Sequence, residues 1–242
     1  MNAFTNFFHV ILWQPLFNLL ILLCYYLPGH NLGVAIIVLT LLIRVILYPL
    51  QDRASRSQLA MQALQPKLKE IQAKYKNNRE EQAKAMMELY KTEKINPFSA
   101  FLVTLIQLPI LFILYRMFWQ GIQEENFVYL YSFVQRPEVI NPMFLGINLN
   151  EPSPFLAVIV GITFFLQSKF AMPKKEKNQN QSPKKSGFAD MFQKQMIFLF
   201  PILITVVLLR LPAALGLYLL VAGIFMAAQQ FFIRKKYYLT KK

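Results

Sequence analysis

The stretch that decides the fold covers residues 31–50 and reads NLGVAIIVLT LLIRVILYPL. About 20 apolar residues are enough for an α-helix to cross the hydrocarbon core of a bilayer. Within this stretch Arg44 lies 12 residues after Leu32 and six before Leu50, which is about 9 Å from the C-terminal end of such a helix. An arginine near the centre of a membrane helix costs ~2.5–3.5 kcal/mol on insertion scales. The stretch therefore predicts a membrane span that carries one costly cation.

The rest of the chain is also strongly apolar. Hydrophobic residues make up 55% of the 242 residues and charged residues 16%, whereas a soluble domain carries about 25% charged residues. Four more apolar ranges follow the first span, at 98–119, 154–172, 195–211 and 213–233. The sequence therefore predicts an all-α polytopic membrane protein with five transmembrane helices.

The N-terminal segment, 1–30, allows two interpretations. Residues 4–27 are apolar but contain His9, Gln14 and Asn18, so this helix either lies in the membrane interface or crosses the bilayer. We expect the interfacial arrangement. The segment has neither a secretory cleavage site nor an Arg-rich transit peptide, which favours a bacterial plasma (inner) membrane.

The basic residues are concentrated in three segments. Residues 51–97, 169–194 and 234–242 hold 22 of the 26 lysines and arginines, whereas the connection 120–153 holds one arginine and four glutamates. The positive-inside rule then places these three segments in the cytoplasm and the N-terminus outside. Residues 173–194 are polar and predict a flexible cytoplasmic loop. The basic tail, with Arg234, Lys235 and Lys236, fits contact with anionic lipid or with ribosomal RNA, and we expect no DNA partner.

A helical hairpin is expected in the cytoplasm at 51–97. Apolar residues recur at spacings of three and four, which is typical of amphipathic helices, and a turn at 76–79 separates two such stripes. The hairpin is either a spacer or a docking platform, whose methionines would adapt to varied apolar partners. The candidate docking residues are Met61, Leu64, Leu68, Met86 and Met87.

Arg44 has no acidic residue available in any predicted span, because all 12 acids lie outside the five ranges. Thr40, Arg44 and Tyr48 follow at intervals of four and share one helix face. Gln107 and Gln167 fall at a similar inner-to-middle depth of the second and third spans. Arg44 either snorkels to the cytoplasmic surface or faces a hydrated groove open to the cytoplasm, where it would attract an acidic or polar segment. We expect the groove.

Several motifs resemble those of the YidC family of membrane-protein insertases. They cover nearly the whole chain in order: Asn31–Arg44 with Tyr48-Pro49-Leu50, Met61–Lys67, Leu89-Tyr90-Lys91 with Asn96-Pro97, and Leu105–Ile110. The chain looks like the minimal, core-only form, without the large periplasmic domain of many relatives. The resemblance implies a five-span core, an N-terminal helix in the outer interface, and insertion of short-tailed clients alone or beside the Sec translocon.

The resemblance also assigns Arg44, Thr40, Gln107 and Gln167 to a client-binding groove. We expect Tyr48 and Tyr218 to belong to the same groove. Two positions depart from the family pattern. Leu219 stands where a second aromatic residue is common, and Gly223 stands where an asparagine is common. The contribution of the fifth span to the groove is therefore left open.

The function expected from these observations is that of a membrane-protein insertase and chaperone. Its expected partners are nascent membrane proteins, the Sec translocon, the ribosome and the signal-recognition-particle receptor. The sequence contains no phosphate-binding loop, no paired carboxylates in a span and no cluster of metal ligands, so we expect no enzyme activity, cofactor or metal. The alternative is a small anion transporter or channel, but internal repeats and acidic coupling residues, typical of secondary transporters, are not visible.

Overall fold

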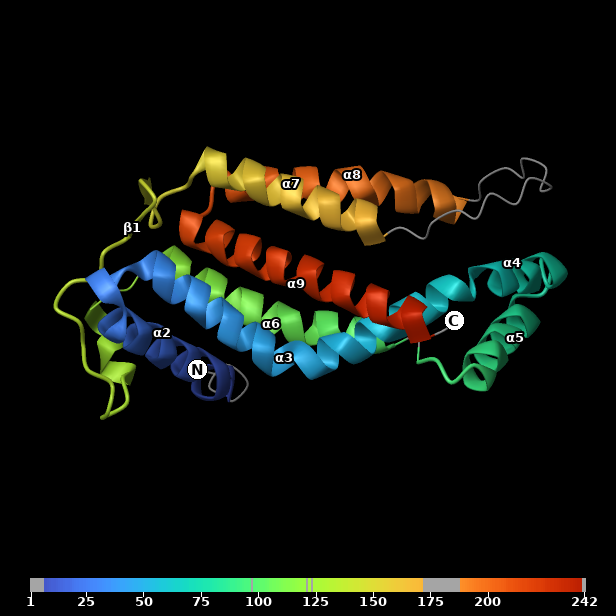
Figure 1. The fold of residues 1–242 in the computed structure, drawn as a ribbon, viewed down its shortest axis with the longest axis horizontal. Helices are drawn as coiled ribbons and strands as arrows, with labels where there is room; N and C mark the ends of the chain where they lie inside the picture. The colour runs from blue at the N-terminus through green and yellow to red at the C-terminus, as the bar shows by residue number, and fades with distance from the viewer. Residues whose placement is uncertain (1–6, 97, 121, 123, 172–187, 241–242) are drawn as a thin grey trace. The chain divides into compact units, whose positions relative to one another are not determined.

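The computed structural model describes residues 7–96, 98–120, 122, 124–171 and 188–240. The chain is mainly helical in these ranges, with one two-stranded hairpin (Figure 1). The elements in chain order are η1 His9–Trp13, α2 Gln14–Tyr26, η2 Pro28–His30, α3 Leu32–Ala63, α4 Gln65–Lys74, α5 Arg79–Thr92, α6 Ser99–Gln120, η3 Glu124–Tyr129, β1 Met143–Phe144, β2 Ile147–Asn148, α7 Pro154–Ala171, α8 Phe188–Leu208 and α9 Ala213–Thr240.

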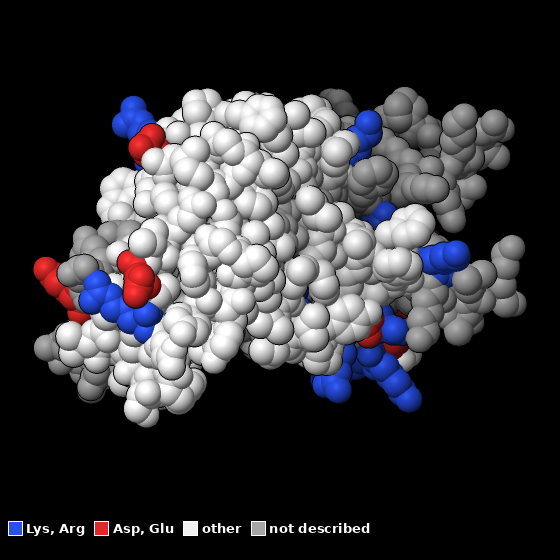
Figure 2. Space-filling model, turned by 60° about the vertical axis from the view of Figure 1, so that its left-hand side comes forward, with Lys and Arg blue, Asp and Glu red and all other residues white. Residues whose placement is uncertain are grey.

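Three helical stretches among the described residues are long and apolar enough to cross a membrane. They are His9–Tyr26, Leu32–Ala63 and Ala213–Lys235, and shorter apolar stretches lie at Leu105–Trp119, Pro154–Lys169 and Phe198–Leu208. Many large hydrophobic side chains on these helices are exposed, such as Ile46, Ile162 and Ile202. Figure 2 shows a broad surface without charged side chains, with lysine, arginine, aspartate and glutamate grouped outside it. Such a surface is suited to lipid rather than to water.

The expected first span and the start of the expected hairpin lie on one continuous helix. The span is expected at residues 31–50, and α3 continues through Pro49 to Ala63. A new helix, α4, then begins at Gln65 with Pro66 in its first turn. Proline has no backbone N–H to donate, so it interrupts a continuing helix but is tolerated in the first turn of a new one. The helix therefore ends at Ala63, and a new helix begins after Leu64.

The described chain separates into two compact units. The first unit contains Met1–Arg44 and Ile110–Ala227, and the second contains Val45–Pro109 and Ala228–Lys242. The boundary therefore falls within α3, α6 and α9, and on α6 it coincides with Pro109.

In the first unit the N-terminal helix is bonded to the connection that follows α6. The buried side chain of Asn18 donates to the Tyr129 carbonyl at 3.0 Å and accepts from the Tyr131 N–H at 2.7 Å. Gln14 donates to the same Tyr129 carbonyl at 3.0 Å, and Trp13 packs edge-on against the Tyr129 ring, with 5.6 Å between centroids. These contacts explain why an apolar helix contains Gln14 and Asn18, because the side-chain amide of each residue bonds to a backbone group of the connection.

The same connection also caps two membrane helices. The hairpin β1–β2 turns at Leu145 and Gly146, both with positive φ. Asn141 exchanges backbone bonds with His30 and Leu32 at the start of α3. The first amides of α9 donate to the carbonyls of residues 149 and 151. Helix starts leave backbone N–H groups without partners, so the connection satisfies donors that the helices cannot satisfy themselves.

Helices α7 and α8 pack side by side along their length (Figure 1). A Cβ atom at Gly161 would collide with the Thr205 hydroxyl, so the two helices approach closely at this glycine. The Thr205 hydroxyl donates to the Pro201 carbonyl at 2.9 Å. Helix α8 begins at Phe188, seven residues before the predicted span at 195, and residues 173–187 of the predicted loop lie outside the described residues.

In the second unit α4 and α5 form an antiparallel hairpin (Figure 1). Asn78 caps α5 by accepting from the Glu81 N–H at 3.2 Å, as expected for asparagine at a helix N-terminus. Lys67 and Glu93 form an ion pair at 2.6 Å between the two arms. The turn that the sequence predicts at 76–79 thus lies between two short helices.

Candidate functional site: a buried arginine and its neighbours

Arg44 is buried within the first unit, with only 4% of its surface exposed. Its Nη1 lies 4.0 Å from the sulfur of Met226 on α9, and the Tyr218 hydroxyl is within hydrogen-bonding reach. Its Nε has no hydrogen-bond partner, and no described acid forms an ion pair with it. A guanidinium group carries five N–H donors and accepts nothing, so this site offers donors without a matching negative charge.

Of the two residues expected beside Arg44 on α3, one is buried and one is exposed. Thr40 is fully buried, and its hydroxyl donates to the Ile36 carbonyl at 2.6 Å. Tyr48 is 41% exposed, and its backbone carbonyl accepts a bond from Gln229 at 3.4 Å. From Thr40 to Tyr48 the helix turns by about 80°, since each residue adds about 100°. This rotation carries Tyr48 towards the edge of the buried face.

Gln167 on α7 reaches α9 at a glycine. A Cβ atom at Gly223 would lie 2.6 Å from Gln167 Nε2, so the absence of a side chain at this position makes room for the amide. Gln167 Nε2 is buried and has no partner among the described residues. Gly223 and Met226 are one turn apart on α9, so Gln167 and Arg44 both reach this part of the helix. The unsatisfied atoms at both side chains are N–H donors.

Tyr218 lies in the first unit and is almost fully buried. The remaining predicted residues belong to the second unit. Gln107 is half-buried and lies in the second unit. In the hairpin Leu64 and Leu68 are buried, Met61 and Met86 are half-buried, and Met87 is 44% exposed. Arg234 and Lys235 lie on the last turns of α9, and the Lys236 side chain lies outside the described residues.

Three further residues were not predicted from the sequence, and the structure places them at buried polar positions or in contact with Arg44. Met226 contacts Arg44, and Gln51 and Gln229 are buried polar residues of the second unit. A signal for both glutamines was present, because Gln51 lies seven residues after Arg44 and Gln229 lies 11 after Tyr218. These steps are close to whole helical turns and keep a residue on the same face.

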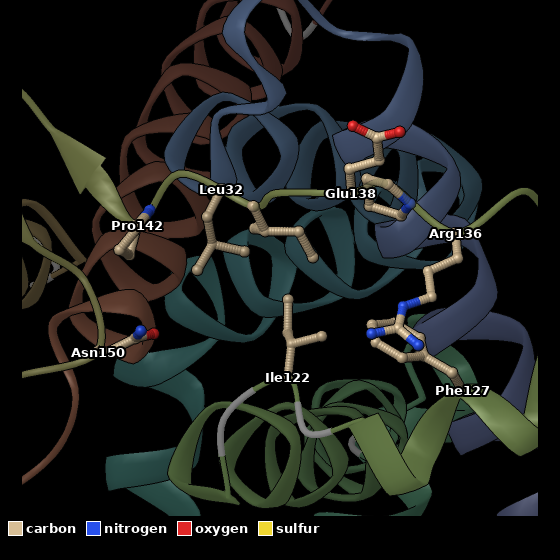
Figure 3. Close-up of a pocket in the computed structure, with 9 residues that line it drawn as sticks. Leu32, Ile122, Phe127, Arg136, Glu138, Pro142 and Asn150 are labelled. Atoms are coloured by element: carbon tan, nitrogen blue, oxygen red, sulfur yellow. The ribbon is translucent and has the colours of Figure 1, made fainter.

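A separate cavity of about 220 Å³ lies in the connection of the first unit (Figure 3). Leu32 and Ile122 point towards each other across it, and the carboxylate of Glu138 points away. The Arg136 guanidinium lies 4.5 Å from the centroid of the Phe127 ring, a cation–π distance. The predicted groove residues do not line this cavity.

The apolar helices define a helical, multi-pass membrane protein. Comparison with known proteins gives the family. The sequence profile of the 60Kd inner membrane protein family matches residues 23–241. The chain therefore belongs to this family, the YidC family.

Its relatives differ in length. A protein named membrane protein insertase YidC from Fusobacterium nucleatum is 35% identical over 85% of this chain and 87% of its own length. Proteins of the same name from Syntrophobacter fumaroxidans and Magnetococcus marinus are 32% and 34% identical, over 87% and 86% of this chain. The chain spans only 36% and 33% of the length of these two relatives.

Proposed function

We propose that this protein is a membrane-protein insertase that moves short polar tails of client proteins across the membrane and releases their apolar helices into lipid. The single observation that carries the proposal is the buried Arg44, which has no acidic partner among the described residues. A protein that only anchors itself in a membrane gains nothing from a buried cation without a counter-charge. A client segment with carboxylate or carbonyl oxygens would supply the missing acceptors during its passage.

The chemistry around Arg44 supports a site for acceptors. Arg44 Nε and Gln167 Nε2 are both buried donors without partners among the described residues. A buried donor without a partner costs about 1–3 kcal/mol, and more when it is charged. Water or a client oxygen would remove this cost. An arginine-centred site of this kind attracts acidic tails and repels basic ones.

The proposed topology has five spans around a groove open to the cytoplasm, with the N-terminus outside and the C-terminus in the cytoplasm. Helix α2 would lie in the outer interface. Its bonds through Gln14 and Asn18 to the connection after α6 support this position. That connection holds only one lysine or arginine, so it would lie on the outer side. Thr40 and Tyr218, both in the first unit with Arg44, are further proposed groove residues. Tyr48 and Gln107, the other residues expected from the sequence, belong to the second unit.

The cytoplasmic parts would receive the client. The exposed Met87 of the hairpin is the side chain best placed for varied apolar segments, and the half-buried Met61 and Met86 are further candidates. The basic end of α9, including Arg234 and Lys235, would contact anionic lipid or the ribosome. The Sec translocon and the signal-recognition-particle receptor are further proposed partners.

The test is reconstitution of the purified protein in liposomes with a single-span client that has a short polar tail. Protection of the tail from external protease measures insertion. We expect protection in proteoliposomes and little in empty liposomes. Equal protection in both would refute the insertase, and solute flux without a client would favour a transporter instead.

A further inference from the structure

The second unit contains a buried polar position that differs in chemistry from the arginine site. Gln51 on α3 is 4% exposed, and both atoms of its side-chain amide, Nε2 and Oε1, are buried without a partner in the described chain. Both a donor and an acceptor are therefore left unsatisfied. Most buried polar side-chain atoms in folded proteins have a partner, so a fully unpaired amide requires an explanation.

Gln229 on α9 is a second buried polar residue of this unit, and it contacts the same part of α3. It is also 4% exposed, and its Nε2 donates to the carbonyl of Tyr48, three residues before Gln51, at 3.4 Å. Good N–H···O bonds measure about 2.7–3.2 Å, so this bond is long and weak. Gln229 can therefore exchange its partner at low cost.

The free atoms at Gln51 determine which ligand fits. A carboxylate would pair with the N–H₂ group but would repel the amide oxygen, and a cation would do the reverse. A neutral peptide group has one N–H and one C=O, so it satisfies both atoms at once. Arg44 and Gln167, by contrast, present only unpaired donors.

We propose that Gln51, with Gln229 beside it, is a second client-binding position that takes a neutral peptide group of the passing main chain. The proposal rests on the insertase function. Main-chain recognition is independent of sequence, which suits a protein that handles varied tails. Arg44 would then favour clients with acidic tails, and Gln51 would bind the main chain of any client.

The test measures stability and binding together. Leucine is close to glutamine in size but has no polar atoms, so Gln51→Leu removes an unsatisfied amide and should raise the melting temperature of the client-free protein. The same change should weaken binding of a fluorescent peptide, an apolar helix with an uncharged Ser/Gly tail, by about five- to thirty-fold in nanodiscs. The matched control is Gln58→Leu, an exposed glutamine of the same helix, for which binding should stay within about twofold.

Each result has a defined meaning. A lower melting temperature for Gln51→Leu would assign the amide a structural role and overturn the proposal. An unchanged Kd, or no binding by the wild type, would also overturn it. If the wild type binds the peptide, loses affinity on Gln51→Leu and still fails to insert clients, the binding position stands and the insertase function fails.

Discussion

The close approach of Gln167 to Gly223 predicts that one added methyl group, in Gly223→Ala, lowers insertion activity and leaves the stability of the protein nearly unchanged. In Gly223→Ala the new Cβ atom would lie 2.6 Å from Gln167 Nε2 and 3.3 Å from Thr163 Cγ2. Ordinary contacts begin near 3.4 Å, so the amide must move by roughly 0.8 Å or more. The atom that must move is the free end of a flexible side chain, which costs about 0.5–1.5 kcal/mol. Alanine in place of glycine within a helix recovers about 1 kcal/mol.

The net change in the free energy of unfolding is therefore expected to be within about 1 kcal/mol. Insertion should respond differently, because the displaced amide would lose the bond to the client that we propose for it. One neutral hydrogen bond contributes about 0.5–1.5 kcal/mol, which corresponds to a two- to tenfold lower insertion rate. The assay is protease protection of a short-tailed client in proteoliposomes, alongside thermal unfolding in detergent.

A matched control and a double variant complete this experiment. Gly216→Ala also adds a methyl group on α9, but its neighbour is the apolar Leu156 at 3.2 Å, so insertion should stay near the wild-type rate. Gln167→Ala should lower insertion as much as Gly223→Ala, and the double variant should lose no more, because both remove the same contact. Additive losses, or a normal rate for Gly223→Ala, would refute the reasoning.

Three further predictions concern stability, each measured by thermal unfolding. Asn18→Leu should destabilise the first unit by about 1–3 kcal/mol, since it leaves a buried backbone N–H unpaired; an unchanged melting temperature would contradict the role of α2 contacts. Gly161→Ala should cost about 1–3 kcal/mol by overpacking α7 against α8, and adding Thr205→Ala should restore most of it. A double-mutant cycle on Lys67 and Glu93, an ion pair with partly exposed side chains, should give a coupling below about 1 kcal/mol; a larger value would indicate that the pair holds the hairpin.

The helical character of the chain could be predicted from sequence because apolar runs and basic loops are local signals. Helices α3, α6, α7, α8 and α9 overlap the five ranges predicted as spans. The expected first span, 31–50, lies within α3, and this helix continues beyond it to Ala63. A change to basic composition at residue 51 marks a change of solvent rather than the end of a helix, and Pro66 marks the actual break.

The surroundings of Arg44 were predictable only in part. The lack of acids in the spans predicts a cation without an acidic partner. In the structure Arg44 is buried, and none of the described acids forms an ion pair with it. Spacing alone does not identify contacts between helices that are far apart in sequence. The close approach of Gln167 to Gly223 depends on how α7 packs against α9. The contact of Arg44 with Met226 depends on how α3 packs against α9, and the sequence reveals neither arrangement. The short hairpin β1–β2 has only two residues in each strand, too few for a periodic signal.

The central claim is that Arg44 attracts the client through its charge, and comparison of two client tails tests it most directly. The measurement is the ratio of insertion rates for clients with an acidic and an uncharged tail, in wild type, Arg44→Met and Arg44→Lys. Hydrogen bonds to charged groups contribute about 1.5–3 kcal/mol, so Arg44→Met should lower insertion of the acidic tail about tenfold or more and affect the uncharged tail far less. Arg44→Lys should keep most of the preference, because it keeps the charge. An acidic tail that Arg44→Met inserts at the wild-type rate would contradict the account.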